Sequence, residues 1–182
     1  MRKSISLLTG VLAISASGLV MASPDWQYIE GGYTQMDFDG NESFEPDGLA
    51  VEGKYALNQN FYLNGEYRFF EEGNFDFDML TVGGGYRMPL NSATDAYFGA
   101  NLERVDTDGY DETGYSLSAG LRSMITEQVE LMGEVGYYDV DEGDATFKVG
   151  GNYYITPQWA VGASYEVIDE IDIMQVTARY AF

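Results

Sequence analysis

The sequence contains no cysteine and no histidine, and it has few basic residues. Without cysteine there is no disulfide, no thiolate metal site and no cysteine nucleophile. Without histidine the chain lacks the commonest general base and the imidazole that many metal sites use. Nine Lys and Arg stand against 30 Asp and Glu, a formal net charge of −21. This acidity predicts no nucleic-acid partner, because binding phosphates requires clustered bases.

Apolar and aromatic residues, in contrast, are abundant. Hydrophobic residues make up 45% of the chain and aromatic residues 15%, with 15 Tyr and 10 Phe. An acidic chain that stays disordered lacks such residues, and Tyr and Phe favour strands. The length of 182 residues suits one domain. These features predict a folded, β-rich protein.

Residues 1–22 have the pattern of an export signal. Arg2 and Lys3 precede an apolar stretch over residues 5–13, and small residues follow as far as Ala22. The other reading is an N-terminal membrane anchor, but the apolar stretch is shorter than the roughly 20 residues that span a bilayer. We expect a signal peptide at 1–22 and a mature domain at 23–182, starting at Ser23, with a net charge of −23.

The mature chain repeats a pattern of about ten residues that alternate between apolar and polar, each repeat followed by a turn. Trp159, Val161 and Ala163, for example, alternate with Ala160 and Gly162. The pattern predicts ten strands, at residues 26–38, 48–57, 61–71, 77–88, 96–106, 113–124, 129–140, 145–155, 159–168 and 172–182.

Two kinds of connection alternate between these segments. Four are short and carry few charges: residues 58–60, 89–95, 125–128 and 156–158. Five are acidic, and 20 of the 30 acids lie in or beside them: residues 39–47, 72–76, 107–112, 141–144 and 169–171. This alternation predicts an all-β, antiparallel, up-and-down barrel with an acidic rim at one end.

The side of the wall that faces outward decides between a soluble and a transmembrane barrel. The polar positions carry nearly balanced charges in mid-strand, which suggests pairing in a confined lumen: Glu30, Glu52, Lys54, Glu66, Arg68, Arg87, Glu103, Arg122, Glu130, Glu134, Lys148, Glu166 and Arg179. Aromatic residues gather at both strand ends, as in membrane-interface belts: Trp26, Tyr55, Phe61, Tyr86, Tyr153, Trp159 and Tyr180 at one end, and Tyr33, Phe69, Phe77, Tyr115, Tyr137, Phe147 and Tyr165 at the other. We therefore predict a transmembrane β-barrel, with a soluble secreted β-sandwich as the alternative.

The last strand ends on Phe182, with Tyr180 two residues before it and apolar residues alternating further back. This ending resembles the C-terminal signature of bacterial outer-membrane β-barrels, and the overall plan resembles the small OmpA transmembrane-domain and OmpX/Ail-like, porin-like family. The resemblance implies a Gram-negative outer membrane and cell envelope location, contact with lipid and lipopolysaccharide, and recognition of Tyr180 and Phe182 by the barrel-assembly machinery. Those proteins typically have eight strands, so eight is the alternative to ten.

We expect no enzyme activity, since small outer-membrane enzymes usually rely on histidine. Two carboxylates could still act as acid and base, for instance Glu130 with Glu134 or Glu66 with Glu103, but we expect these acids to pair with Arg68, Arg87, Arg122 or Arg179. The backbone radius of roughly 10 Å for ten strands predicts an occluded or very narrow polar lumen. The predicted role is a monomeric barrel for envelope integrity or surface interaction; the alternative is a narrow, cation-preferring channel or porin for small solutes.

The acidic loops suggest a weak Ca²⁺ or Mg²⁺ role, and no other cofactor is expected. Three of these loops begin with an Asp-x-Asp pair, and hard cations take carboxylate oxygens; the pairs are Asp37 and Asp39, Asp106 and Asp108, and Asp139 and Asp141. The alternative is that these acids only favour turns and solvation. Arg104 falls on the lipid-facing side next to the rim, where it contacts a lipid phosphate or extends to the interface.

Overall fold

The computed structural model describes residues 23–38, 45–73, 75–107, 109–140 and 143–182, without the side chains of residues 72 and 75. These residues form ten strands: β1 (Tyr28–Phe38), β2 (Asp47–Ala56), β3 (Phe61–Glu72), β4 (Phe75–Pro89), β5 (Thr94–Thr107), β6 (Tyr110–Met124), β7 (Val129–Asp139), β8 (Gly143–Tyr154), β9 (Trp159–Ile168) and β10 (Ile171–Ala181). In this part of the chain, no helix has the length and hydropathy needed to cross a membrane.

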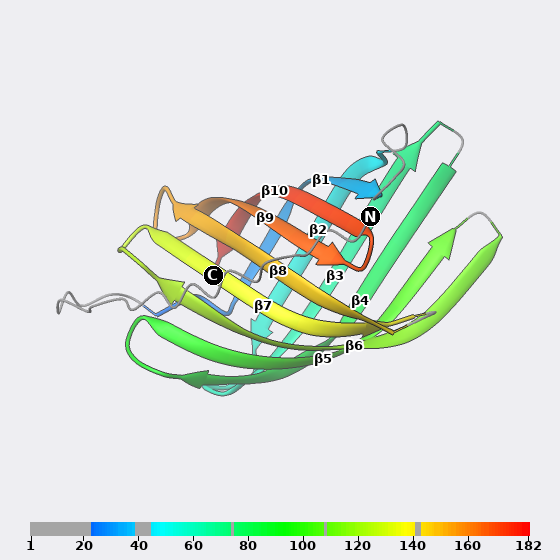
Figure 1. Cartoon of the computed structure of the whole chain (residues 1–182). Coiled ribbons are helices and arrows are strands. Elements are labelled where there is room, and N and C mark those ends of the chain that lie inside the picture. The colour runs from blue at the N-terminus through cyan, green and yellow to red at the C-terminus, as the bar shows by residue number, and fades with distance from the viewer. Residues whose placement is uncertain (1–22, 39–44, 74, 108, 141–142) are drawn as a thin grey trace, which may run out of the picture.

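The ten strands close into one antiparallel barrel (Figure 1). Each strand pairs with its neighbours in sequence, and β1 pairs with β10 along a register that runs from Tyr28 opposite Ala181 to Phe38 opposite Ile171. Closure leaves no open sheet edge, which is the condition for a β-structure to span lipid. The predicted ten-stranded barrel is confirmed, and the eight-stranded alternative is wrong.

Several strands extend further toward the acidic loops than predicted. Strand β4 begins at Phe75, and the link between β5 and β6 shrinks from the expected 107–112 to residues 108–109. Gly73 and Gly109 have φ angles of 66° and 92°, a region that glycine adopts without strain and that tight hairpins require. The turns are therefore short, and rim acids such as Asp111 lie in paired strands.

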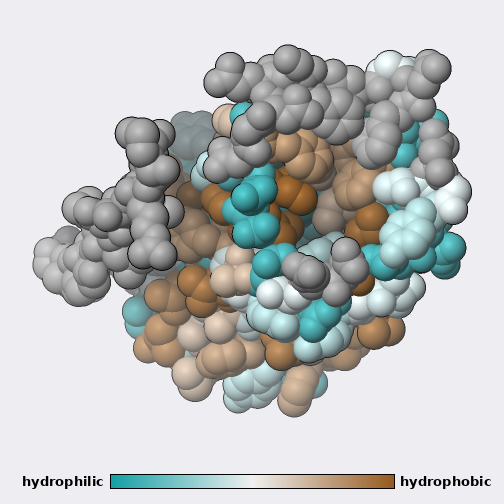
Figure 2. All heavy atoms as spheres, turned by 45° about the vertical axis from the view of Figure 1, so that its right-hand side comes forward, coloured by the Kyte–Doolittle hydropathy of each residue, from teal (hydrophilic) through white to brown (hydrophobic). Residues whose placement is uncertain are grey.

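The outer wall is apolar and the inner wall is polar, the reverse of a soluble barrel. Leu102 is 68% exposed and Leu49 is 64% exposed, both on the outside. In Figure 2, hydrophobic atoms cover much of the lower outer wall and also lie in the hollow between hydrophilic atoms. Aromatic side chains are exposed on the outer wall near both strand ends: Tyr33, Tyr55, Phe61, Tyr86, Tyr115, Tyr137, Phe147, Tyr153, Trp159, Tyr165 and Tyr180.

Two aromatic residues predicted for the belts lie inside the barrel instead. Trp26 is 2% exposed and packs in the lumen. Phe77 lies opposite Phe70 on the inner face, with the two ring centroids 5.8 Å apart. The prediction was wrong for Trp26 because it precedes β1, so strand alternation does not determine its direction. It was wrong for Phe77 because the inner face becomes apolar at the acidic-loop end.

Candidate functional site: the lumen

The lumen gathers all thirteen charged residues predicted for it. They alternate with lipid-facing neighbours along every strand of the barrel, and each is buried or half-buried. The structure adds Asp95, which the sequence pattern assigned to a turn but which lies in β5 and is 1% exposed. Together these fourteen described residues comprise eight acids and six bases.

One ion-pair network occupies the lumen near the short turns. Arg122 Nη2 donates to both carboxylate oxygens of Glu130, at 2.8 and 2.9 Å. Arg179 contacts the same carboxylate at 3.3 Å and donates through Nε to Glu30 at 2.6 Å. Glu130 is fully buried, so two guanidinium groups compensate one desolvated charge.

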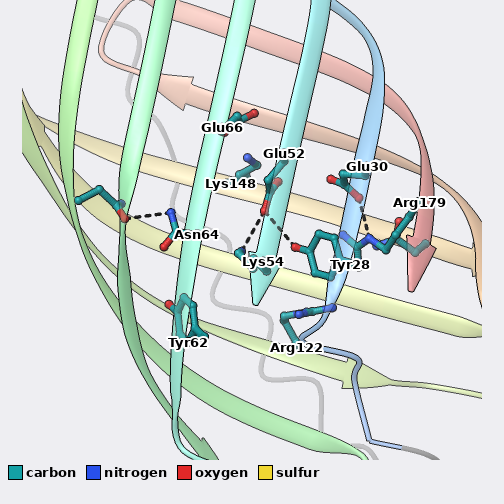
Figure 3. Close-up of polar contacts among 12 residues, drawn as sticks. Tyr28, Glu30, Glu52, Lys54, Tyr62, Asn64, Glu66, Arg122, Lys148 and Arg179 are labelled. Atoms are coloured by element: carbon teal, nitrogen blue, oxygen red, sulfur yellow. Dashed lines mark hydrogen bonds and ion pairs between the residues drawn. The ribbon is translucent and has the colours of Figure 1, made fainter. Parts of the chain in front are cut away.

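A second network lies further along the lumen. Arg68 bridges Glu66 at 2.7 Å and Glu166 at 2.8 Å, and Lys148 contacts Glu166 at 3.6 Å. Between the two networks Lys54 pairs with Glu52 at 3.2 Å. Figure 3 shows Lys148, on β8, near Glu52 and Lys54, which come from β2 on another side of the barrel.

The two carboxylate pairs considered for acid–base chemistry are held in other contacts. Glu130 is bound by Arg122, and Glu66 by Arg68. The expected pairing with an arginine is therefore found for one acid of each pair, Glu130 and Glu66. Glu103 and Glu134 have no ion pair with a base within the described ranges.

An aromatic cluster fills the short-turn end of the lumen. The ring of Trp26 lies 4.7 Å from Tyr62 and 5.5 Å from Tyr97, and its indole nitrogen donates to Asp95 at 2.7 Å. The Arg122 guanidinium lies 4.7 Å from the Trp26 ring, within cation–π range. The segment that carries Trp26 is held between strands, because Phe182 N donates to Gln27 O at 3.1 Å. Sequence reasoning missed this contribution to the lumen.

An apolar cluster fills the acidic-loop end of the lumen. Met36, Phe70, Met79, Ile168 and Ile173 are each buried there. Around them pack Phe38, Phe77, Val105, Tyr138 and Ile171. Two of the five core members come from β10 and the end of β9, so the cluster joins opposite ends of the chain.

A polar cavity of about 120 Å³ lies between the two clusters. Charged, hydroxyl and amide side chains line it, among them Glu66, Arg68, Lys148, Glu103 and Asn101. This volume is well above the roughly 10–15 Å³ that one water molecule requires, so the cavity can hold water molecules or a small ion. The occluded or very narrow lumen expected from the sequence stays a prediction.

The proposed Ca²⁺ or Mg²⁺ site at the acidic loops stays a prediction. Asp39, Asp108 and Asp141 lie outside the described residues, as does the signal peptide. Among described residues no three acids come close enough together to hold a metal ion. Arg104, half-exposed on the outer wall, pairs with Asp106 at 3.3 Å and Asp111 at 3.4 Å.

A closed antiparallel barrel with an apolar outer wall and a charged lumen is a transmembrane β-barrel. The chain belongs to the family of the outer membrane protein beta-barrel domain, which it matches over residues 6–147. It is therefore a protein of the bacterial outer membrane. Among curated proteins, none matches this chain.

Solved structures share the fold at low identity. The COG4313 outer membrane channel from Pseudomonas putida F1 superposes with a TM-score of 0.55 and 10% identity, over 93% of this chain and 100% of that one. The KdgM porin in complex with disordered oligogalacturonate gives a TM-score of 0.51 and 15% identity, over 85% and 99% of the two chains. At these identities the similarity shows the fold alone.

Proposed function

We propose that this protein is a non-enzymatic outer-membrane barrel with a closed lumen, whose wall and rim serve envelope integrity or surface interaction. The observation that carries the proposal is the filling of both ends of the lumen. Trp26 occupies the short-turn end, and the Met36–Phe70 cluster occupies the acidic-loop end. A solute would have to displace both groups of side chains to cross.

The ion pairs between these two ends support the same proposal. Arg122, Glu130 and Arg179 are each less than 5% exposed. Arg122 on β6 binds Glu130 on the neighbouring β7, and Arg179 contacts the same carboxylate from β10. Breaking a buried pair costs about 3–5 kcal/mol, because a desolvated charge is left without a partner. Such a network favours a rigid lumen over a water-filled path.

The outer surface supports a partnership with lipid. Exposed leucine, valine and phenylalanine side chains cover the outer wall, and lipid is the environment that satisfies such a surface. We propose that the barrel works as a monomer, contacts lipid and lipopolysaccharide along this wall, and is inserted by the barrel-assembly machinery through its Tyr180 and Phe182 ending.

A narrow, cation-preferring channel is the second candidate. The central cavity and the excess of two acids over bases in the lumen favour it. The shared fold with a channel and a porin is consistent with it. A solute such as the oligogalacturonate named for the porin fits this lumen poorly, because that chain is polyanionic and the lumen has more acids than bases.

Conductance measurements in a planar bilayer distinguish the closed barrel from the narrow channel. The refolded mature barrel is expected to give no stable conductance steps across the voltage range in which a known porin conducts. Stable steps, with a reversal potential set by the cation gradient, would contradict the closed barrel and establish the channel. A faster-migrating band in an unboiled gel sample confirms first that the barrel is folded.

A further inference from the structure

Glu103 is a buried carboxylate with no basic partner within the described part of the chain. It lies on β5, is 4% exposed and faces the lumen. Its two oxygens accept hydrogen bonds from neutral hydroxyls only: Ser116 Oγ donates to Oε1 and Thr81 Oγ1 donates to Oε2, each at 2.6 Å. An ionised carboxylate that is buried without a counter-charge costs several kcal/mol.

Charge counting around Arg68 leaves Glu103 as the unbalanced group. Arg68 binds both Glu66 and Glu166, and Lys148 binds Glu166 as well. These two bases balance these two acids. Glu103 belongs to the same part of the lumen, because it lines the same cavity. Glu103 is therefore left without a base in this network. Glu134, which also lines the cavity, has no ion pair among the described residues either.

Polar side chains around Glu103 are held in place by hydrogen bonds and present several oxygen atoms to the cavity. Asn64 donates to Asn101 Oδ1 at 3.0 Å, and Asn101 donates to Ser116 Oγ at 2.9 Å, which orients the Ser116 hydroxyl toward the carboxylate. Figure 3 shows Asn64 at the start of this chain of hydrogen bonds. Glu103 and its neighbours in the chain all line the cavity of about 120 Å³.

The hydroxyl group of Tyr138 is an independent indication that the cavity binds a water molecule or an ion. Its ring lines the same cavity, yet its hydroxyl oxygen is buried and has no hydrogen-bond partner among the described residues. Buried hydroxyls are generally hydrogen-bonded, so an unsatisfied one beside a polar cavity points to a bound water or ion.

We propose that Glu103 holds a monovalent alkali cation in this cavity, with oxygens of Thr81, Ser116 and Tyr138 around it. Carboxylate, hydroxyl and amide oxygens are the ligands that hard cations take. A single positive charge matches the one carboxylate charge that Glu103 brings to this site. Within the described ranges no group of three acids is close enough to bind a metal ion, so the site lacks the charge of a divalent one. The proposal requires no conduction and stands apart from the proposed function.

The test measures the stability of the refolded mature barrel while sodium chloride replaces choline chloride at constant ionic strength. The charge of choline is shielded by methyl groups, so choline does not replace sodium among carboxylate and hydroxyl oxygens. A ligand that binds only the folded state stabilises it by mass action, roughly eleven-fold in the folding equilibrium at ten times its Kd. We expect a saturable rise in the unfolding midpoint of the native protein and none in Glu103→Gln.

Glu127→Gln is the matched control, since Glu127 is an exposed acid in the turn between β6 and β7. It is expected to keep the full sodium response. An equal response in Glu103→Gln and the native protein would overturn the site, and so would the absence of any sodium response in the native protein. In the latter case a proton or a water occupies the place of the cation.

A second variant keeps the test decisive if Glu103→Gln does not fold. Thr81→Val removes one oxygen from the site and keeps the carboxylate. The sodium concentration at half effect is expected to rise several-fold. An unchanged concentration would overturn the assignment. Line broadening of the ²³Na signal by the native barrel, lost on this substitution, provides a direct reading.

Discussion

The indole nitrogen of Trp26 donates a 2.7 Å hydrogen bond to Asp95, a residue 69 positions further along the chain. This bond ties the segment before β1 to the start of β5, across the short-turn end of the barrel. Asp95 also contacts Arg87 at 3.3 Å. The N-terminal segment of the described chain thus contributes a side chain to the filling of the lumen, from a position outside the strands.

Trp26→Ala is expected to loosen this end of the barrel. It removes the contacts with Tyr62 and Tyr97 and leaves Asp95 with Arg87 alone. Large-to-small substitution of a buried aromatic residue costs about 3–5 kcal/mol, measurable by urea unfolding. Trp159→Ala is the control, because Trp159 is 53% exposed on the outer wall at the same end. Equal losses in both variants would contradict the closure role of Trp26.

Arg122→Met is expected to destabilise the barrel by about 3–5 kcal/mol, since Glu130 loses its two short hydrogen bonds while staying buried. Adding Glu130→Met is expected to recover part of the loss, because no lone charge then remains. Arg104→Met tests an exposed ion pair, for which about 0–1 kcal/mol is expected. The three variants are compared by urea unfolding in the same detergent. A loss as small for Arg122 as for Arg104 would refute the energetic role of the network.

Gly120→Ala is expected to disrupt the aromatic cluster. A Cβ at this position would lie 2.6 Å from the Tyr97 ring and 2.7 Å from the backbone oxygen of Gly133, so the ring and the neighbouring strand would both have to move. Overpacking of this kind costs about 1–3 kcal/mol. Gly133→Ala, on the neighbouring strand, is the matched control because nothing lies within 4 Å of its added Cβ. Unfolding midpoints that fall equally for both glycines would show that backbone effects, and not the Tyr97 contact, are responsible.

Asp37→Asn is expected to stabilise the barrel slightly. Asp37 lies directly opposite Asp172 in the register between β1 and β10. Like charges directly opposite one another destabilise a sheet, by roughly 0.2–1 kcal/mol. The gain should disappear in 1 M salt, where the screening length is about 3 Å. A loss of stability at low salt would instead show that Asp37 has a favourable contact.

Calcium is expected to act on the same rim if the Asp-x-Asp loops bind it. A titration to millimolar calcium should raise the unfolding midpoint of the native barrel, and a chelator should reverse the rise. The response should weaken in Asp37→Asn. If millimolar calcium produces neither a thermal shift nor a heat of binding, the hypothesis of a divalent cation at these loops is wrong.

Strand positions and wall direction could be predicted because both depend on a period of two. Along β9, Trp159, Val161 and Ala163 face lipid while Ala160 and Gly162 face the lumen. In a transmembrane barrel the apolar positions face lipid, so the alternation places the polar positions in the lumen. Arg122 and Glu130 can therefore be predicted to face the lumen even though their partners are unknown. The partners themselves depend on register and barrel curvature, which the alternation does not contain.

Asp95 shows where the pattern fails. It stands at the end of a polar connection, and only its pairing with Arg122 in the β5–β6 register places it inside the wall. Trp26 precedes the first strand, so no alternation applies to it. Phe77 follows the inward parity of β4, but the lumen changes from polar to apolar along the barrel axis, and that change appears only when residues from several strands come together.

The sequence alone determined that the chain forms a ten-stranded transmembrane barrel, because the alternation of apolar and polar residues, the turns and the final phenylalanine are local features. Only the tertiary structure decided which side chains fill the two ends of the lumen, which charges pair, and that Glu103 is left without a base. These outcomes depend on side chains from distant strands meeting in a space a few residues wide. Distances across that space follow from closure of the barrel, and no local pattern encodes them.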